Sequence, residues 1–222
     1  MKVLVTRPEP GASATAAKLE ALGHEAILAP SLTIRPVAAR LPAAPAALII
    51  TSGQAVPCLP PAFSHVPVFC VGDATAGRLR AAGFPRVESA RGDAEDLFRL
   101  VTARKLAGLH VMAVGERHGI ALAQRLRAAG LTVTRRKVYA AKPVRAIPAQ
   151  ALAALAAGEV NAALFYSAES ARAFVRLSPP GTQAMIACAL SSAVAGALCG
   201  LPWASIRVAV APSEADMMAL LA

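Results

Sequence analysis

The sequence predicts an α/β protein in which parallel β-sheets are covered by helices on both faces. Three observations lead to this prediction. Short apolar segments alternate with helical segments along the 222 residues. The apolar segments are continuously hydrophobic, which is typical of strands buried in a parallel sheet. The chain also repeats itself, and a repeat of this kind constrains the architecture before any single motif is considered.

Two different segments, A and B, each occur twice. Lys2-Val-Leu-Val through Gly23 in A resembles His110-Val-Met-Ala-Val through Gly130 in A′. In B, residues 46–52 (Ala-Ala-Leu-Ile-Ile-Thr-Ser) are echoed in B′ at 162–167 (Ala-Ala-Leu-Phe-Tyr-Ser). The order along the chain is A (1–34), B (35–105), A′ (106–141) and B′ (142–222).

Each segment predicts its own elements. Segments A and A′ each read strand, helix, strand, and a glycine, Gly23 or Gly130, ends the helix as a C-cap. Their strands are expected at 3–6, 25–30, 111–114 and 132–139, and their helices at 13–22 and 120–129. Segments B and B′ predict strands at 46–51, 67–71, 86–90, 160–166, 184–189 and 206–211. Their helices are expected at 53–59, 74–82, 94–103, 148–157, 168–177, 191–199 and 213–221.

The connections suggest how the segments combine into domains. Residues 32–36 and 138–143 occupy the same place in A and A′, and both end in proline, which favours an extended residue before it. Two such stretches could pair as a two-stranded hinge. Domain 1 would then be discontinuous, from 1–34 plus 142–222, with domain 2, residues 35–141, inserted into it. One A and one B give five strands, enough for one flavodoxin-like sheet in each domain.

Composition excludes several classes of function. The formal net charge is +10, which attracts anions, but no long Lys/Arg run or basic–aromatic interleaving supports nucleic acid as a partner. The four cysteines form no CxxC pair and are expected to be reduced thiols in a cytoplasmic protein. The four histidines are scattered and expected at the surface or at caps. No metal-ligand spacing, nucleotide-binding loop or signal peptide is present.

One uncharged stretch, residues 177–206, is long enough to cross a membrane. Its Ala, Gly, Ser and Pro content, and the charges at the matching place in B, favour strand–turn–helix structure instead.

Turns between strand and helix are the candidate binding sites. In a parallel α/β sheet, ligands bind beyond the carboxyl ends of the strands, where helix N-termini offer free N–H groups. Ser and Thr at a single such turn are explained by simple N-capping. Several turns together predict an anion-binding cleft. The candidate residues are Thr51, Ser52, Gly72, Thr75, Gly92, Gly115, Ser167 and Ser192. Tyr139, one of only two tyrosines, stands at the crossover from A′ to B′ and could also be a packing residue there.

Several motifs resemble those of the uroporphyrinogen-III synthase family. They are Val3-Leu-Val-Thr-Arg-Pro8, Thr51-Ser52-x-x-Ala-Val56, Val71-Gly-x-x-Thr75-Ala76, Gly92-x-Ala94-x-x-Leu97 and Val138-Tyr139, followed by degenerate second copies. Each is weak alone, but their order and spacing are similar to the family's along nearly the whole chain.

The resemblance implies a fold and a reaction. Members of the family have two flavodoxin-like domains and convert the linear tetrapyrrole hydroxymethylbilane into uroporphyrinogen III, inverting the last pyrrole and losing water, without metal or cofactor. By this resemblance Tyr139 assists departure of the hydroxyl, and Thr75 and Ser192 are the hydroxyl-bearing residues of the cleft. The partner would be a polycarboxylate tetrapyrrole, with no nucleic acid or membrane, and the protein is expected to be a cytoplasmic monomer.

Two departures from the family's pattern leave an alternative open. Ala189 replaces a glycine before Ser191-Ser192, and Glu169 places an acid where an anionic substrate would approach. They are compatible with a non-catalytic anion-binding or regulatory module of the same fold. A periplasmic-type solute binder is disfavoured because the sequence shows no signal peptide.

Overall fold

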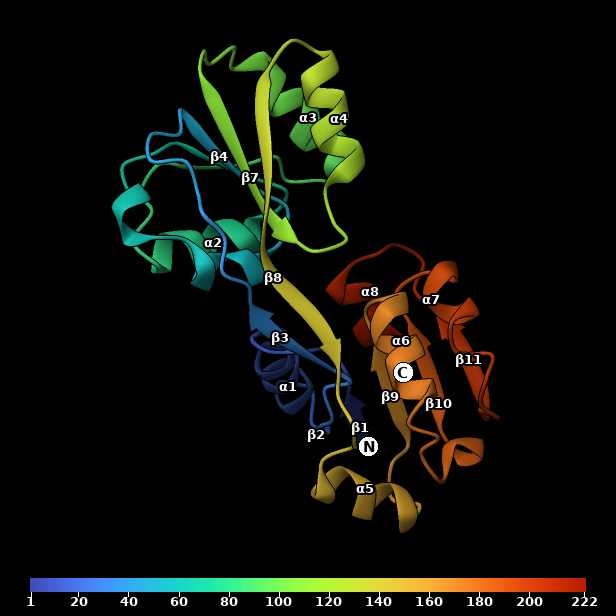
Figure 1. Cartoon of the computed structure of the whole chain (residues 1–222). Helices are drawn as coiled ribbons and strands as arrows, with labels where there is room; N and C mark the ends of the chain where they lie inside the picture. Colours follow the sequence, from blue (N-terminus) through green and yellow to red (C-terminus); the bar gives the residue numbers. More distant parts are fainter. The chain divides into compact units, whose positions relative to one another are not determined.

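A computed structural model describes all residues, 1–222. The chain divides by its contacts into two compact units. Unit 1 consists of Met1–Ile34 and Lys142–Ala222, and unit 2 of Arg35–Ala141. Each unit has its own sheet, with helices packed against it (Figure 1). The predicted α/β class, with parallel sheets and covering helices, is confirmed.

Unit 1 contains a five-stranded sheet in the order β11-β10-β9-β1-β2, in which every neighbouring pair is parallel. Its strands are β1 (Lys2–Val5), β2 (Glu25–Leu28), β9 (Ala162–Phe165), β10 (Ile186–Ala189) and β11 (Ser205–Val208). Its helices are α1 (Gly11–Ala21), α5 (Ala149–Ala156), α6 (Ala168–Val175), α7 (Ser192–Gly196) and α8 (Glu214–Ala219), with the short 3₁₀ helix η3 (Thr182–Ala184).

The core of unit 1 lies on both faces of this sheet, because successive residues of a strand point to opposite sides. On β1, Leu4 belongs to one cluster, with Phe165 and Phe174. Val3 and Val5 belong to the other, with residues of α1 and α8. Burial on two faces explains why β1 and β9 are apolar at nearly every position.

Unit 2 is built on a sheet in the order β3-β8-β7-β4-β5-β6. The strands are β3 (Leu32–Pro36), β4 (Ala47–Ile50), β5 (Val68–Cys70), β6 (Val87–Ser89), β7 (Leu109–Gly115) and β8 (Thr132–Pro143). The helices are α2 (Asp73–Ala81), α3 (Ala94–Ala103) and α4 (Ile120–Ala128), with the 3₁₀ helices η1 (Gly53–Cys58) and η2 (Pro61–Phe63). Helices α3 and α4 lie side by side, and their buried residues join one cluster with β4, β5 and β7 (Figure 1).

β3 and β8 contain the residues at which the chain passes between the units, and they are neighbours (Figure 1). The Val37 amide donates to the Val138 carbonyl at 2.9 Å, and the Val144 amide donates to the Ser31 carbonyl at 3.1 Å. The two bonded pairs run in opposite directions along the chain, as in an antiparallel ladder.

Three expectations differ from the structure. Residues 53–58 form a 3₁₀ helix rather than an α-helix, because Pro57 inside it has no N–H to donate. The helix expected at 191–199 is limited to Ser192–Gly196. His110 is not at the surface but 1% exposed, since it stands in the central strand β7, with Nδ1 3.2 Å from the Gly108 carbonyl oxygen.

The uncharged stretch 177–206 contains η3, β10 and α7 and reaches into β11. Within it, Met185, Ala187, Ala189 and Leu198 are core residues. None of the helices combines the length and the hydrophobicity that a membrane span requires.

Candidate functional site

The predicted turns of unit 2 meet at one edge of its sheet. β5, β4 and β7 are parallel neighbours, with Ile50 in register with both Cys70 and Ala113. Their carboxyl ends therefore lie together, where Gly115 is the last residue of β7 and the turns after β4 and β5 contain Thr51, Ser52 and Gly72. β4 and β7 are also the strands between which the order along the sheet reverses. In α/β sheets, ligands bind outside the carboxyl ends at such a switch point.

Tyr139 reaches the same edge from β8. Gly115, the last residue of β7, is in register with Tyr139, next to a β-bulge, and the Glu116 amide donates to the Tyr139 carbonyl at 3.1 Å. A Cβ on Gly115 would lie 2.8 Å from both Cε2 and Cζ of Tyr139, and 3.0 Å from Nδ1 of His118. Only glycine leaves space for the ring here. The Tyr139 residue is 4% exposed.

The role expected for Gly115 needs a correction. The residue does not begin a helix, because α4 starts only at Ile120 and its N-cap is Gly119. Gly119 adopts a left-handed conformation, with φ of 75°, in which non-glycine residues are strained. Gly115 therefore contributes the space beside Tyr139, rather than free N–H groups of a helix start.

Two other turns of this edge begin helices. Ser52 is the N-cap of η1, and its Oγ accepts a hydrogen bond from the Gln54 amide at 3.3 Å. Gly72 is the N-cap of α2, whose third residue is the half-buried Thr75. Arg78 of α2 crosses over to η1, where its Nη1 would be 2.6 Å from a Cβ on Gly53. Sequence reasoning missed Arg78 as a cation at this edge.

Gly92 lies in the turn after β6, at the start of α3. The Asp93 side chain accepts from the amides of Glu95 and Asp96, and Asp96 accepts from the Asp93 amide, which completes a capping box. A Cβ on Gly92 would overlap the Asp96 carboxylate. The glycine is therefore required by the cap. These hydrogen bonds hold the pKa of the exposed Asp93 carboxyl below its usual value.

Ser167 and Ser192 lie at the carboxyl edge of the other sheet, in unit 1. Ser167 caps α6, with its Oγ accepting from the Ser170 amide at 3.1 Å. Ser192 is the exposed first residue of α7, which follows Ala189 at the end of β10. Glu169 is half-buried in the first turn of α6, where a carboxylate is stabilised by the helix dipole.

A polar cluster at the switch point of unit 1, between β1 and β9, was not predicted. The Glu214 carboxylate accepts hydrogen bonds from Arg7 Nη1 (3.2 Å), Thr15 Oγ1 (3.0 Å) and Tyr166 Oη (3.1 Å). Burial is the main reason that the pKa of Tyr166 is raised well above its usual value. The scarcity of tyrosine was a signal that could have pointed to Tyr166 as it did to Tyr139.

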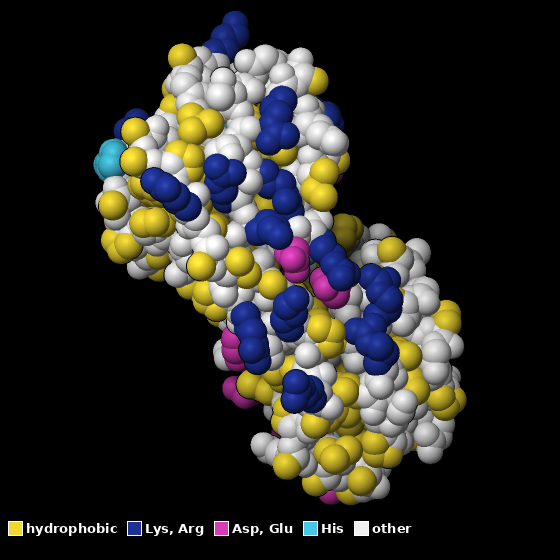
Figure 2. All heavy atoms as spheres, in the orientation of Figure 1, with side chains coloured by type: hydrophobic (Ala, Val, Ile, Leu, Met, Phe, Trp, Pro, Cys, Tyr) yellow, Lys and Arg dark blue, Asp and Glu magenta, His cyan; other side chains and the backbone are white.

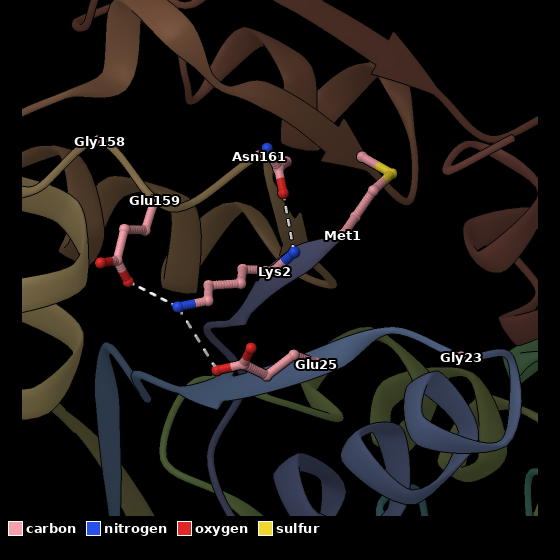
Figure 3. A pocket seen from close by; sticks show the side chains of 7 residues that line it. All are labelled: Met1, Lys2, Gly23, Glu25, Gly158, Glu159 and Asn161. Atoms are coloured by element: carbon pink, nitrogen blue, oxygen red, sulfur yellow. Dashed lines mark hydrogen bonds and ion pairs between the residues drawn. The ribbon is translucent and has the colours of Figure 1, made fainter.

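The amino edge of the unit 1 sheet bears a shallow hollow of about 600 Å³ (Figure 3). There the Lys2 ammonium lies 2.6 Å from Glu159 and 3.8 Å from Glu25, and its backbone amide donates to Asn161 at 2.8 Å. These contacts tie together the amino ends of β1 and β2 and the segment before β9. The hollow lies at the edge opposite to the predicted site and contains none of the predicted residues.

Charge is distributed unequally between the units. Unit 2 carries 15 of the 23 Lys and Arg residues but only 6 of the 13 Asp and Glu residues, which gives it a formal charge of +9. Unit 1, with 8 basic and 7 acidic residues, is left with +1. On the face shown in Figure 2, basic side chains clearly outnumber acidic ones. No cluster of three or more His, Cys, Asp or Glu side chains suited to a metal ion is present.

Solved structures of similar fold come from two bacteria. Uroporphyrinogen-III synthetase from Helicobacter pylori 26695 superposes with a TM-score of 0.68 at 18% identity, over 99% of this chain and 97% of the other. A mutant uroporphyrinogen III synthase from the extremely thermophilic bacterium Thermus thermophilus has a TM-score of 0.50 at 19% identity, over 100% and 97%. At these identities the likeness concerns the fold.

Sequence comparison identifies the family. No curated protein matches the chain in sequence. The sequence model of the family described as uroporphyrinogen-III synthase HemD matches residues 13–221, which include both units. The resemblance seen in the motifs is thus confirmed: the chain belongs to the uroporphyrinogen-III synthase family.

Proposed function

We propose that this chain carries out the reaction of its family, the closure of hydroxymethylbilane to uroporphyrinogen III. The match of the family model over residues 13–221 is the observation that carries this proposal. In the reaction, the hydroxyl at one end of the linear tetrapyrrole leaves as water. The resulting azafulvene cation is attacked within the same molecule, and passage through a spiro intermediate inverts the last pyrrole. The enzyme must therefore supply an acid, stabilise a cation and hold the chain in one fold.

The carboxyl edge of unit 2 is the proposed place for most of the substrate carboxylates. Unit 2 has a formal charge of +9, and Arg78 lies at this edge over Gly53. At α2 the N-cap Gly72 has no side chain to accept from the first N–H groups, which leaves them available to an anion, whereas at η1 the Gln54 amide is already bonded to Ser52 Oγ. Thr51, Thr75 and the turn at Gly92 extend the same edge. In unit 1, Ser167 and Ser192 would contribute hydroxyl groups.

Tyr139 is the proposed general acid. A phenol with a pKa near 10 is protonated at neutral pH and can donate its proton to the departing hydroxyl. Its position beside the switch point of unit 2 supports this role. Because the residue is 4% exposed, the substrate can reach the phenol only when the covering residues move. Gly115 is one of the residues packed against the ring.

The two units are proposed to act as two flavodoxin-like domains joined by a hinge at β3 and β8. The strand order of unit 1, β2-β1-β9-β10-β11, reads 2-1-3-4-5 along the chain, which is the flavodoxin order. In unit 2 the strands β8-β7-β4-β5-β6 follow the same spatial order if the two strands of A′ (β7, β8) are numbered 1 and 2 and the three strands of B (β4, β5, β6) are numbered 3, 4 and 5. The numbering differs from the chain order because B precedes A′ in the chain. A ladder of two strands would permit rotation of one domain against the other. The protein is proposed to work as a cytoplasmic monomer.

The experiment is an isomer-resolved assay. Purified protein is given hydroxymethylbilane, and the oxidised products are separated by chromatography and corrected for the type I ring that forms spontaneously. We expect type III product in proportion to the enzyme added. A protein that binds the tetrapyrrole but leaves only type I product would instead be the non-catalytic module.

A further inference from the structure

Arg135 of β8 binds three carbonyl groups of one turn. Its Nε donates to the His118 carbonyl at 2.7 Å, and its Nη2 donates to the Gly115 carbonyl at 3.1 Å and also to the Glu116 carbonyl. These three carbonyls belong to four consecutive residues, 115–118, which comprise the last residue of β7 and the turn that follows it. A planar guanidinium with five donors in fixed geometry is suited to such a contact, and it stays protonated at any working pH.

The clamped turn is the one that packs on Tyr139. At its start, Gly115 lies against the Tyr139 ring, and the Glu116 amide donates to the Tyr139 carbonyl. At its end, Nδ1 of His118 approaches the same point, within 3.0 Å of where a Cβ on Gly115 would lie. The turn is held at both ends by Arg135, and its two inner residues, Glu116 and Arg117, are exposed.

Without Arg135 the turn would lose the side chain that donates to three of its carbonyls. The Gly115 carbonyl would keep the hydrogen bond from the His118 amide, at 3.1 Å, whereas the His118 carbonyl would lose its bond of 2.7 Å. Gly115 begins the turn and Gly119 follows it, and glycine allows many backbone conformations. One side chain thus selects one conformation of the turn.

We infer that Arg135 is a positioning residue for Tyr139: it fixes the turn 115–118 and thereby the orientation and accessibility of the phenol. The inference rests on the proposed function for its effect on turnover, but not for its effect on the ring. Misplacing a reacting group by about 1 Å can cost on the order of 10²-fold in rate. Arg135 touches the turn and not the reacting atoms, so it acts only through its neighbours.

The test compares Arg135→Gln with Arg136→Gln. Arg136 is the next residue of the same strand and has the same charge, but its Nε donates to one carbonyl only, that of Arg40, at 3.2 Å. We expect Arg135→Gln to lower kcat on the order of tenfold with KM changed less than about twofold, and Arg136→Gln to leave kcat unchanged. In a Tyr139→Phe background, Arg135→Gln should cause no further loss, because the group that it positions is gone. An equal loss in both backgrounds would overturn the inference.

A second readout does not depend on catalysis. The chain has only two tyrosines, so ring-labelled protein gives two sets of NMR signals, and Tyr139→Phe identifies those of Tyr139. Arg135→Gln should shift the signals of Tyr139 and leave those of Tyr166 in place, whereas Arg136→Gln should shift neither. Unchanged Tyr139 signals in the folded variant would overturn the inference. If Arg135→Gln shifts the Tyr139 signals but keeps full turnover, Arg135 does position the ring, and the proposed role of Tyr139 as general acid is refuted instead.

Arg135→Lys is a more conservative variant that tests the inference even if Arg135→Gln does not fold. Lysine keeps the charge but lacks the planar fork, so it can satisfy fewer of the three carbonyls in this geometry. It should fall between wild type and Arg135→Gln in both kcat and the Tyr139 shift. Wild-type values for the lysine variant in both readouts would show that charge alone suffices, and the clamp would be refuted.

Discussion

The guanidinium carbon of Arg7 lies 4.1 Å from the centroid of the Tyr166 ring, and both side chains donate hydrogen bonds to the Glu214 carboxylate. Arg7 follows β1, Tyr166 follows β9, and Glu214 begins α8, so the cluster joins three elements of unit 1. Stacking of Arg on Tyr adds a cation–π contact to the ion pair. Gly11 is part of the same packing, because a Cβ there would lie 2.5 Å from Arg7 Nε.

Glu214→Gln should destabilise unit 1. The amide keeps the size of the carboxylate but removes the charge that pairs with Arg7, and the side chains of both partners are less than a third exposed. We expect a loss of about 1–2 kcal/mol in the free energy of unfolding, measured in urea. Glu159→Gln, at the exposed pair with Lys2, is the control and should change it little. Equal effects of the two substitutions would contradict a special role for the cluster.

Tyr166 should make the stability of the protein sensitive to alkaline pH. Because its pKa in the folded state is raised by burial, the unfolded chain releases the phenolic proton first. The contribution of Tyr166 is therefore fully present below its unfolded pKa of about 10 and is lost as the pH rises above that value. Chemical unfolding over a pH series should show a steeper alkaline loss for wild type than for Tyr166→Phe. Parallel curves would show that Tyr166 titrates normally.

Tyr139→Phe tests the proposed acid. The substitution keeps the packing of the ring against Gly115 and removes only the hydroxyl. We expect turnover to fall on the order of 10²-fold, as for loss of a general acid, with the melting temperature nearly unchanged. The residual product should remain mostly type III, because the fold of the bound tetrapyrrole, rather than the proton, selects the isomer. Full activity would leave Tyr139 as a packing residue, and an enzymatic switch to type I would show that the phenol positions the last ring.

Binding of the substrate should weaken as ionic strength rises. The substrate carries eight carboxylates, and salt screens their attraction to the basic residues of unit 2 wherever water has access. KM measured over a salt series should increase steadily. Thr75→Ala should raise KM modestly, since the backbone donors of α2 remain, whereas Thr102→Ala, in α3, should not. A KM independent of salt would mean that the net charge does not contribute to binding.

Local sequence signals predicted most of the fold. Apolar strands, capping glycines such as Gly23 and the acidic start at Asp93 act over a few residues, and the elements they predict are present. The side-chain contacts of the candidate sites join residues far apart in the sequence, and local signals do not predict such contacts. Arg7 and Glu214 are 207 residues apart, and they meet only because α8 packs through Met217 into the core cluster of β1 and α1. The partners of Arg135 are backbone carbonyls, which every residue has, and no residue type marks them in the sequence.

The interrupted path of the chain has a consequence for its synthesis. Unit 2 is continuous from Arg35 to Ala141, whereas Lys2 and its partner Asn161 are 159 residues apart. On the ribosome, we expect unit 2 to fold before the sheet of unit 1 can form, because β9, the strand that pairs with β1, is synthesised later. Nascent chains stalled so that residue 141 has just left the ribosomal exit tunnel, with β9 still inside it, should accordingly resist protease over 35–141 before the first 34 residues do.

Once formed, the inserted unit would hold its two ends side by side on β3 and β8, where the Val37 amide donates to the Val138 carbonyl. The insertion of residues 35–141 between β2 and β9 then costs the sheet of unit 1 little more loop-closure entropy than a short turn would, because the two ends of the inserted unit are already adjacent. Folding of unit 2 thereby brings together the two parts of the chain that form unit 1.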